Sequence, residues 1–138
     1  MTPDRNLLCR YTERFAVVVH AENPPSDAEW NALLDEYLTK PGVAHVLVYS
    51  AGGAPNAKQR VRLTSVLSLR GGSVAVLTPS KLARAAGMAL NLFRPEIRVF
   101  APSELDLAFD YLGANEVERA MLARVLDEVK AELRLPRD

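Results

Sequence analysis

Three residues with reactive or ligand-binding side chains stand directly after short, strongly apolar runs: His20 after AVVV, Ser50 after HVLVY and Thr78 after VAVL. If these runs are parallel strands, their carboxyl ends meet at one edge of a sheet, where ligands of α/β proteins gather. Glycines in the following turns would let backbone N–H groups approach an anion. The predicted ligand-binding residues are therefore His20, Ser50, Gly52, Gly53, Asn56, Thr78 and Ser80. The alternative is that the glycines only shape turns, while Asn56 and Ser80 only cap helices.

Catalytic chemistry has less support in the same residues. Ser50 and His20 are a conceivable nucleophile and base, but they lack a convincing third triad member and a Gly-x-Ser-x-Gly turn. The loop SAGGAPN lacks the Gly-Lys-Ser/Thr ending of a phosphate-binding P-loop. His45 lies within an apolar run and is expected to be buried and hydrogen-bonded, and Cys9 has no partner at metal-ligand spacing. We therefore predict no catalytic residue, no metal site and no cofactor, and favour a non-enzymatic protein.

The positions of these residues depend on alternating strands and helices. Short segments rich in β-branched residues predict strands over residues 7–12, 15–19, 43–49, 74–77 and 97–101. Apolar residues at helical spacing predict helices over residues 26–39, 57–69, 80–93, 103–112 and 116–133. Strands separated by helices favour parallel neighbours joined by right-handed crossovers. The predicted fold is α/β, with a mixed, mainly parallel five-stranded sheet that begins with an antiparallel hairpin.

Local signals define several helix ends. Ser26 and Ser103 stand at predicted N-caps, where a hydroxyl accepts a backbone hydrogen bond, and Gly113 suits a left-handed C-cap. Gly87 lies in the middle of a predicted helix, where glycine costs about 1 kcal/mol relative to alanine. We therefore expect Gly87 to mark a close contact between this helix and a neighbour.

The segments HVLVYSAGGAPNAKQRVRL, SVAVLTPSKLARAAGMALNLF and IRVFAPSELDLAFDYLG follow the predicted hairpin in this order. In this order they resemble the STAS-like (anti-sigma-factor-antagonist-like) single-domain proteins, over residues 15–113. The resemblance implies one STAS-like domain over residues 1–138, with residues 114–138 as a C-terminal helical extension. It also implies a non-enzymatic regulatory module of bacterial type that binds a protein partner, sometimes a nucleotide or lipid, and is often switched by serine phosphorylation. The Asp-Ser motif of the switching members is absent here, and Ser50 precedes the corresponding loop.

Charge is segregated along the chain. The 17 basic and 17 acidic residues cancel, which argues against a nucleic-acid partner. Residues 37–95 nevertheless carry eight basic residues and no acidic one, whereas each flanking segment is net acidic. The helices over residues 57–69 and 80–93 should therefore form one basic surface that suits an acidic protein, a phosphorylated ligand or an anionic membrane. Its predicted partner contacts are Lys58, Arg60, Arg62, Lys81 and Arg84. The alternative is that acidic residues of the flanking segments fold over this surface and neutralise it.

Three functional hypotheses follow. The first is a regulatory interaction module that binds an acidic protein through the basic helical face and the loop from Ser50 to Asn56. The second is a protein that binds a small molecule (a nucleotide, a phosphate-containing compound or a lipid) at the strand ends. The third is a self-assembling structural protein, a homo-oligomer in which the acidic last helix meets the basic helices of another copy.

We expect a cytoplasmic protein without a transmembrane segment, because no apolar run approaches about 20 residues and the lone Cys9 cannot form an internal disulfide.

Overall fold

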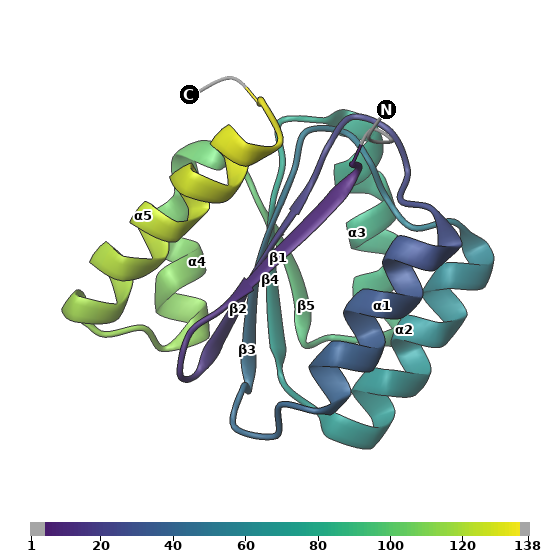
Figure 1. The fold of residues 1–138 in the computed structure, drawn as a ribbon, viewed down its shortest axis with the longest axis horizontal. Helices are drawn as coiled ribbons and strands as arrows, with labels where there is room; N and C mark the ends of the chain where they lie inside the picture. The colour runs from purple at the N-terminus through teal and green to yellow at the C-terminus, as the bar shows by residue number, and fades with distance from the viewer. Residues whose placement is uncertain (1–4, 136–138) are drawn as a thin grey trace.

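A five-stranded sheet forms the centre of the structure, a computed structural model that describes residues 5–135 (Figure 1). The strands are β1 (Leu7–Tyr11), β2 (Phe15–His20), β3 (His45–Ser50), β4 (Ser73–Leu77) and β5 (Ile97–Phe100). They lie side by side in sequence order, with β1 antiparallel to β2 and all other neighbours parallel. The predicted α/β fold with a mixed, mainly parallel sheet and an initial hairpin is confirmed.

The helices cover the two faces of the sheet unequally (Figure 1). One face carries α1 (Asp27–Leu38), α2 (Ala57–Arg70) and α3 (Lys81–Phe93), and the other carries α4 (Leu105–Leu112) and α5 (Glu116–Glu132). The parallel strands advance across the sheet in one direction, so right-handed crossovers place every connecting helix on the same face. The helices after β5 then return across the opposite face. Within residues 5–135, no helix combines the length and apolar character needed to cross a bilayer.

Strand β2 separates two apolar cores, because all six of its residues are buried. Phe15, Val17 and Val19 pack with α4 and α5, whereas Ala16 and Val18 face the layer of α1, α2 and α3. The apolar stripe of α5, formed by Leu122, Leu126 and Val129, packs against the sheet in the first of these cores. Burial of β2 on both faces agrees with the near-continuous apolar run AVVV of this strand.

Helix ends follow the local signals with one exception. Ser26 caps α1 through a reciprocal capping box, and Gly113 closes α4 at φ +71°. The predicted capping role of Ser103 is wrong. Residues Pro102–Glu104 form a 3-10 turn, and the carboxylate of Glu104 accepts a hydrogen bond from the backbone N–H of Ala101 at 2.7 Å. The proline favours this early turn, so α4 begins two residues after Ser103.

Helix α3 lies close to the edge strand β5. A Cβ added at Gly87 would lie 2.5 Å from Cγ2 of Val99, which is far inside van der Waals contact. The expectation that Gly87 marks a close approach is confirmed. Arg94, just after α3, ties the helix to α2, because its Nη2 donates to the carbonyl of Thr64 at 2.8 Å and to the hydroxyl of Ser68.

Candidate ligand-binding site

The structure brings the strand-end residues together at the carboxyl edge of the parallel strands. His20 and Ser50 are register partners across β2 and β3. The hydroxyl of Thr78, directly after β4, donates to the carbonyl of Ser50 at 2.8 Å. The glycines and caps that follow these strands occupy the same edge, as the parallel topology requires.

Most of these groups hold the loops in place. The Ser50 hydroxyl donates to the carbonyl of Gly53 at 2.6 Å and accepts from the N–H of Gly52 at 3.1 Å. Thr78, which is fully buried, accepts from the N–H of Ser80. These hydroxyls therefore have structural partners, and their predicted role in ligand binding stays a prediction.

The helix starts at this edge are closed by their own side chains. Asn56 accepts from the N–H of Gln59 at 2.8 Å, and Ser80 accepts from the N–H of Ala83 at 3.2 Å. These bonds satisfy N–H groups that an anion would otherwise use. The geometry gives no independent support to an anion site at either helix start.

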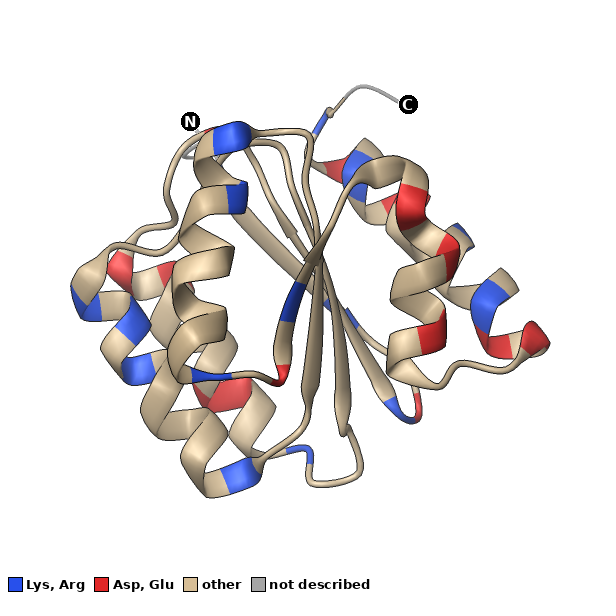
Figure 2. Cartoon of the chain, turned by 180° about the vertical axis from the view of Figure 1, so that it is seen from behind, with Lys and Arg blue, Asp and Glu red and all other residues tan. Residues whose placement is uncertain are grey.

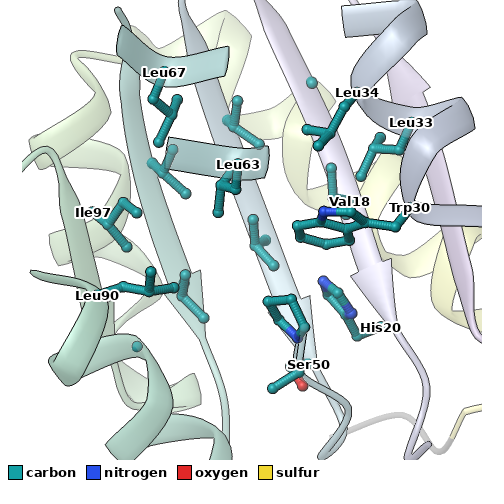
Figure 3. A pocket seen from close by; sticks show the side chains of 18 of the residues that line it. Val18, His20, Trp30, Leu33, Leu34, Ser50, Leu63, Leu67, Leu90 and Ile97 are labelled. Carbon is teal, nitrogen blue, oxygen red and sulfur yellow. The ribbon is translucent and has the colours of Figure 1, made fainter. Parts of the chain in front are cut away.

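An apolar cavity of about 120 Å³ lies next to this edge, between the sheet and the layer of α1, α2 and α3 (Figure 3). Its wall includes Val48 and Val76, which lie on the two central parallel strands of the sheet but are only half-buried. Leu63 of α2 and Leu90 of α3 line the cavity from the helical side and are also only partly buried. The helices therefore leave the middle of this sheet face incompletely covered.

His20 supplies a polar group to the wall of this cavity. Its side chain is only 5% exposed, and its Nδ1 has no hydrogen-bond partner among the described residues. The imidazole lies beside the indole of Trp30, with ring centroids 6.0 Å apart, and Figure 3 shows both rings at the cavity. Burial lowers the pKa of His20 to about 4, although the carboxylate of Glu29 acts in the opposite direction. The ring is therefore neutral at pH 7, with one nitrogen that accepts a hydrogen bond and one that donates.

The sequence places Trp30 among the apolar residues of the predicted helix over residues 26–39 but does not predict it as a ligand-binding residue. It is buried on α1, and its Nε1 donates to the carbonyl of Gln59 at 2.9 Å, which joins α1 to α2 above His20. The helical spacing of Trp30 indicates a core position, but no sequence signal shows that it borders a cavity. Val48 of β3 and Val76 of β4 likewise lie in apolar runs that predict buried strands, and no sequence signal shows that they border a cavity.

The other predicted histidine has a structural partner. His45 Nδ1 lies 2.6 Å from the hydroxyl of Ser73, its register partner on β4, so its predicted hydrogen bond is present, although the side chain is only half-buried. Among residues 5–135, no three His, Cys, Asp or Glu side chains are grouped so that they could hold a metal ion.

The predicted basic surface is partly neutralised within the chain. Helices α2 and α3 do lie on one face of the sheet, as expected (Figure 2). However, Lys58 pairs with Asp27 of α1 at 3.6 Å, and Arg62 pairs with Asp35 of the same helix. The other arginines predicted to contact a partner donate to backbone carbonyls: Arg60 to Pro55 at 3.0 Å and Arg84 to Thr78 at 3.4 Å. Asp27 and Asp35 of α1 thus neutralise the positive charges of Lys58 and Arg62 on α2.

The acidic residues of α5 play no part in this neutralisation, because α5 covers the opposite face of the sheet (Figure 2). Its Glu118 and Glu132 pair instead with Arg14 and Arg10 of the initial hairpin region. Of the two flanking acidic segments, the N-terminal one folds beside α2, whereas the C-terminal one contributes Glu96, which pairs with Arg94 just after α3 at 3.5 Å.

Comparisons of the chain with protein family profiles, curated proteins and solved structures gave no significant match. The α/β architecture thus stands on the structure itself, and the resemblance to STAS-like proteins stays a prediction.

The buried His20 makes the stability of the fold pH-dependent. Its pKa of about 4 in the folded chain lies below the ordinary value of 6.5, so the unfolded chain takes up the proton first. Stability should therefore be complete above pH 6.5 and fall as the pH decreases toward 4, by up to about 3 kcal/mol. Urea unfolding at pH 7.5, 6.5, 5.5 and 4.5 measures this loss.

The matched variants are His20→Gln and His45→Gln. His45 also has a lowered pKa, because of burial first and then Arg14, so His45→Gln should remove a small part of the loss. His20→Gln should remove most of it between pH 6.5 and 4.5, above the range in which Glu118 titrates with its pKa of about 2. Equal pH profiles for wild type and His20→Gln would show that His20 is not the group responsible.

Proposed function

We propose that the protein binds a small, uncharged and mainly apolar molecule in the cavity, with a polar group of that molecule hydrogen-bonded to His20. The single observation that carries this proposal is the unpartnered Nδ1 of a buried, neutral imidazole beside an apolar cavity. A buried polar atom without a partner costs about 1–3 kcal/mol, which a ligand with a complementary group would recover. The proposal makes the protein a binding protein and assigns no catalytic step.

The size and polarity of the cavity define the class of ligand. An apolar cavity of about 150 Å³ is known to hold benzene, so a volume of about 120 Å³ suits one small ring or a short branched chain. Moving a phosphate or carboxylate into apolar surroundings without a counter-charge is strongly unfavourable. Of the ligand classes predicted from the sequence, nucleotides and phosphate-containing compounds therefore have less support than an uncharged apolar molecule.

The two other hypotheses have less support from the geometry. Lys58 and Arg62 already have carboxylate partners, which weakens the case for an acidic protein on α2. The apolar stripe of α5 packs on its own sheet, which weakens the case for assembly through that helix. Both hypotheses stay predictions.

Calorimetry and thermal unfolding with benzene, phenol, indole and sodium phosphate test the proposal. Phenol should bind more tightly than benzene by about fivefold, because its hydroxyl can bond to the imidazole at a gain of about 1 kcal/mol. Bound phenol should raise Tm with concentration, whereas phosphate should have no effect. His20→Leu should remove the preference for phenol and leave benzene binding.

Valine-to-phenylalanine variants locate the site. Val48→Phe and Val76→Phe fill the cavity from two strands and should each abolish binding, so either one that folds gives the answer. Val117→Phe is the matched control, because Val117 is exposed on α5 on the other face. Absence of binding by the wild type, or binding that survives both cavity substitutions, would refute the proposal.

A further inference from the structure

The outward face of α3 carries most of its large apolar residues, whereas its inward face has mainly small residues beside Leu90. Ala83 and Gly87 are buried against the sheet. Four large apolar side chains of α3 are between 60% and 81% exposed: Leu82, Met88, Leu92 and Phe93. An amphipathic helix ordinarily buries its large apolar residues. We call these four side chains the α3 ridge.

Cations lie beside the α3 ridge, and acidic residues do not occur on its helix. Lys81 and Arg84 are exposed on the first turn of α3. Residues 57–95 contain no Asp or Glu, and Figure 2 shows α3 with blue segments and no red one. The acidic residues of α1 contact Lys58 and Arg62 and not the cations of α3. An acidic residue that does lie near α3 is Glu104, which lines a hollow together with Arg84, while Lys81 stays exposed.

We infer that α3 docks the protein on an anionic lipid surface, with the α3 ridge inserted at the boundary between headgroups and acyl chains. A helix of 13 residues is about 20 Å long and lies parallel to the surface, as amphipathic interfacial helices do. Lys81 and Arg84 then contact the phosphates. This inference concerns the outer face of α3 and does not depend on the cavity ligand.

The charges and the shape of this face favour lipid over a protein partner. In a symmetric contact between two copies of α3, neither helix would offer a carboxylate to the Lys81 and Arg84 of the other, so these cations would gain no ion pair from the contact. The hollow beside the helix, whose lining includes Arg84, Arg98 and Glu104, carries charges of both signs, whereas a partner helix would need an apolar groove. The α3 ridge instead projects into solvent along the helix, as the exposure of Leu92 and Phe93 shows.

Vesicle flotation tests the inference. The protein should bind vesicles of 70% phosphatidylcholine and 30% phosphatidylglycerol at 50 mM salt. Binding should weaken at 500 mM salt and be weak with phosphatidylcholine alone. Lys81→Gln with Arg84→Gln should reduce binding to the anionic vesicles about 25-fold, since each basic residue contributes about fivefold. Leu92→Gln with Phe93→Gln should reduce it at least tenfold.

The control variants distinguish binding through the α3 ridge from nonspecific binding by other exposed apolar residues. Val117→Gln and Leu107→Gln replace exposed apolar residues of α5 and α4 on the other side of the sheet and should leave vesicle binding unchanged. Circular dichroism should show the native fold in every variant, because only exposed side chains are changed. Failure to bind anionic vesicles would overturn the inference, and so would binding that is insensitive to the α3 substitutions. A dimer that Leu92→Gln with Phe93→Gln dissociates, without vesicle binding, would assign the ridge to self-association and also overturn it.

Discussion

Replacement of Gly53 by alanine is expected to lower the free energy of unfolding by about 3 kcal/mol or more. The new Cβ would lie 2.4 Å from the carbonyl oxygen of Asn23 and 2.6 Å from that of Ala21. Both are backbone atoms, and the N–H of Gly53 donates to the same Ala21 carbonyl at 2.8 Å. The loops after β2 and β3 would have to separate. Chemical denaturation at pH 7.5 measures the effect.

Gly42→Ala is the matched control for this substitution. A Cβ at Gly42 would have its nearest contact at 3.9 Å, which is ordinary van der Waals distance. Its effect on stability should stay within about 0.5 kcal/mol. Gly53→Ala should also weaken phenol binding, because Gly53 and the adjoining Ala54 and Pro55 line the cavity. Similar free energies of unfolding for the two variants would show that the loops after β2 and β3 can separate without loss of stability.

Trp30→Ala is expected to lower the free energy of unfolding by about 4 kcal/mol. Trp30 is 4% exposed, and the substitution removes both its buried ring and the hydrogen bond from Nε1 to Gln59. It should also admit water to His20, whose pKa would rise from about 4 toward 6.5, because burial is the main cause of the shift. An NMR titration of the imidazole protons measures the pKa, and thermal unfolding measures the stability.

Trp30→Phe separates the two effects and is the safer variant if Trp30→Ala fails to fold. Phenylalanine keeps an apolar ring but loses the indole donor, so stability should fall by only about 1–2 kcal/mol. The pKa of His20 should rise less than in the alanine variant. An unchanged pKa of His20 in a folded variant would show that Trp30 does not control its burial.

The cavity and the α3 ridge have a common structural origin. Small residues of α3, including Ala83, Ala86 and Gly87, face the sheet and line the cavity, where larger side chains would fill the space. Apart from Leu90, the large apolar residues of the helix point outward instead. The close approach of Gly87 to Val99 holds the helix against β5 in this orientation.

Much of the fold follows from the sequence by itself. Strands and helices are encoded by short-range patterns, namely β-branched apolar runs, helical spacing and capping residues such as Ser26 and Gly113. The chirality of crossovers then determines the sheet and the common face of α1, α2 and α3. The clustering of His20, Ser50 and Thr78 at one edge follows from the same topology. Only the start of α4 departed from the local signal, because Pro102 initiates a 3-10 turn first.

The tertiary structure decided what these residues do. In the folded chain, the hydroxyls of Ser50 and Thr78 form hydrogen bonds to backbone carbonyls, whereas Nδ1 of His20 has no partner among the described residues. Lys58 and Arg62 pair with carboxylates of α1. Such outcomes depend on distances between residues far apart in the chain and on how completely one layer covers another. A one-dimensional pattern specifies which face of a helix is apolar, but the space left beneath that helix is set by packing in three dimensions.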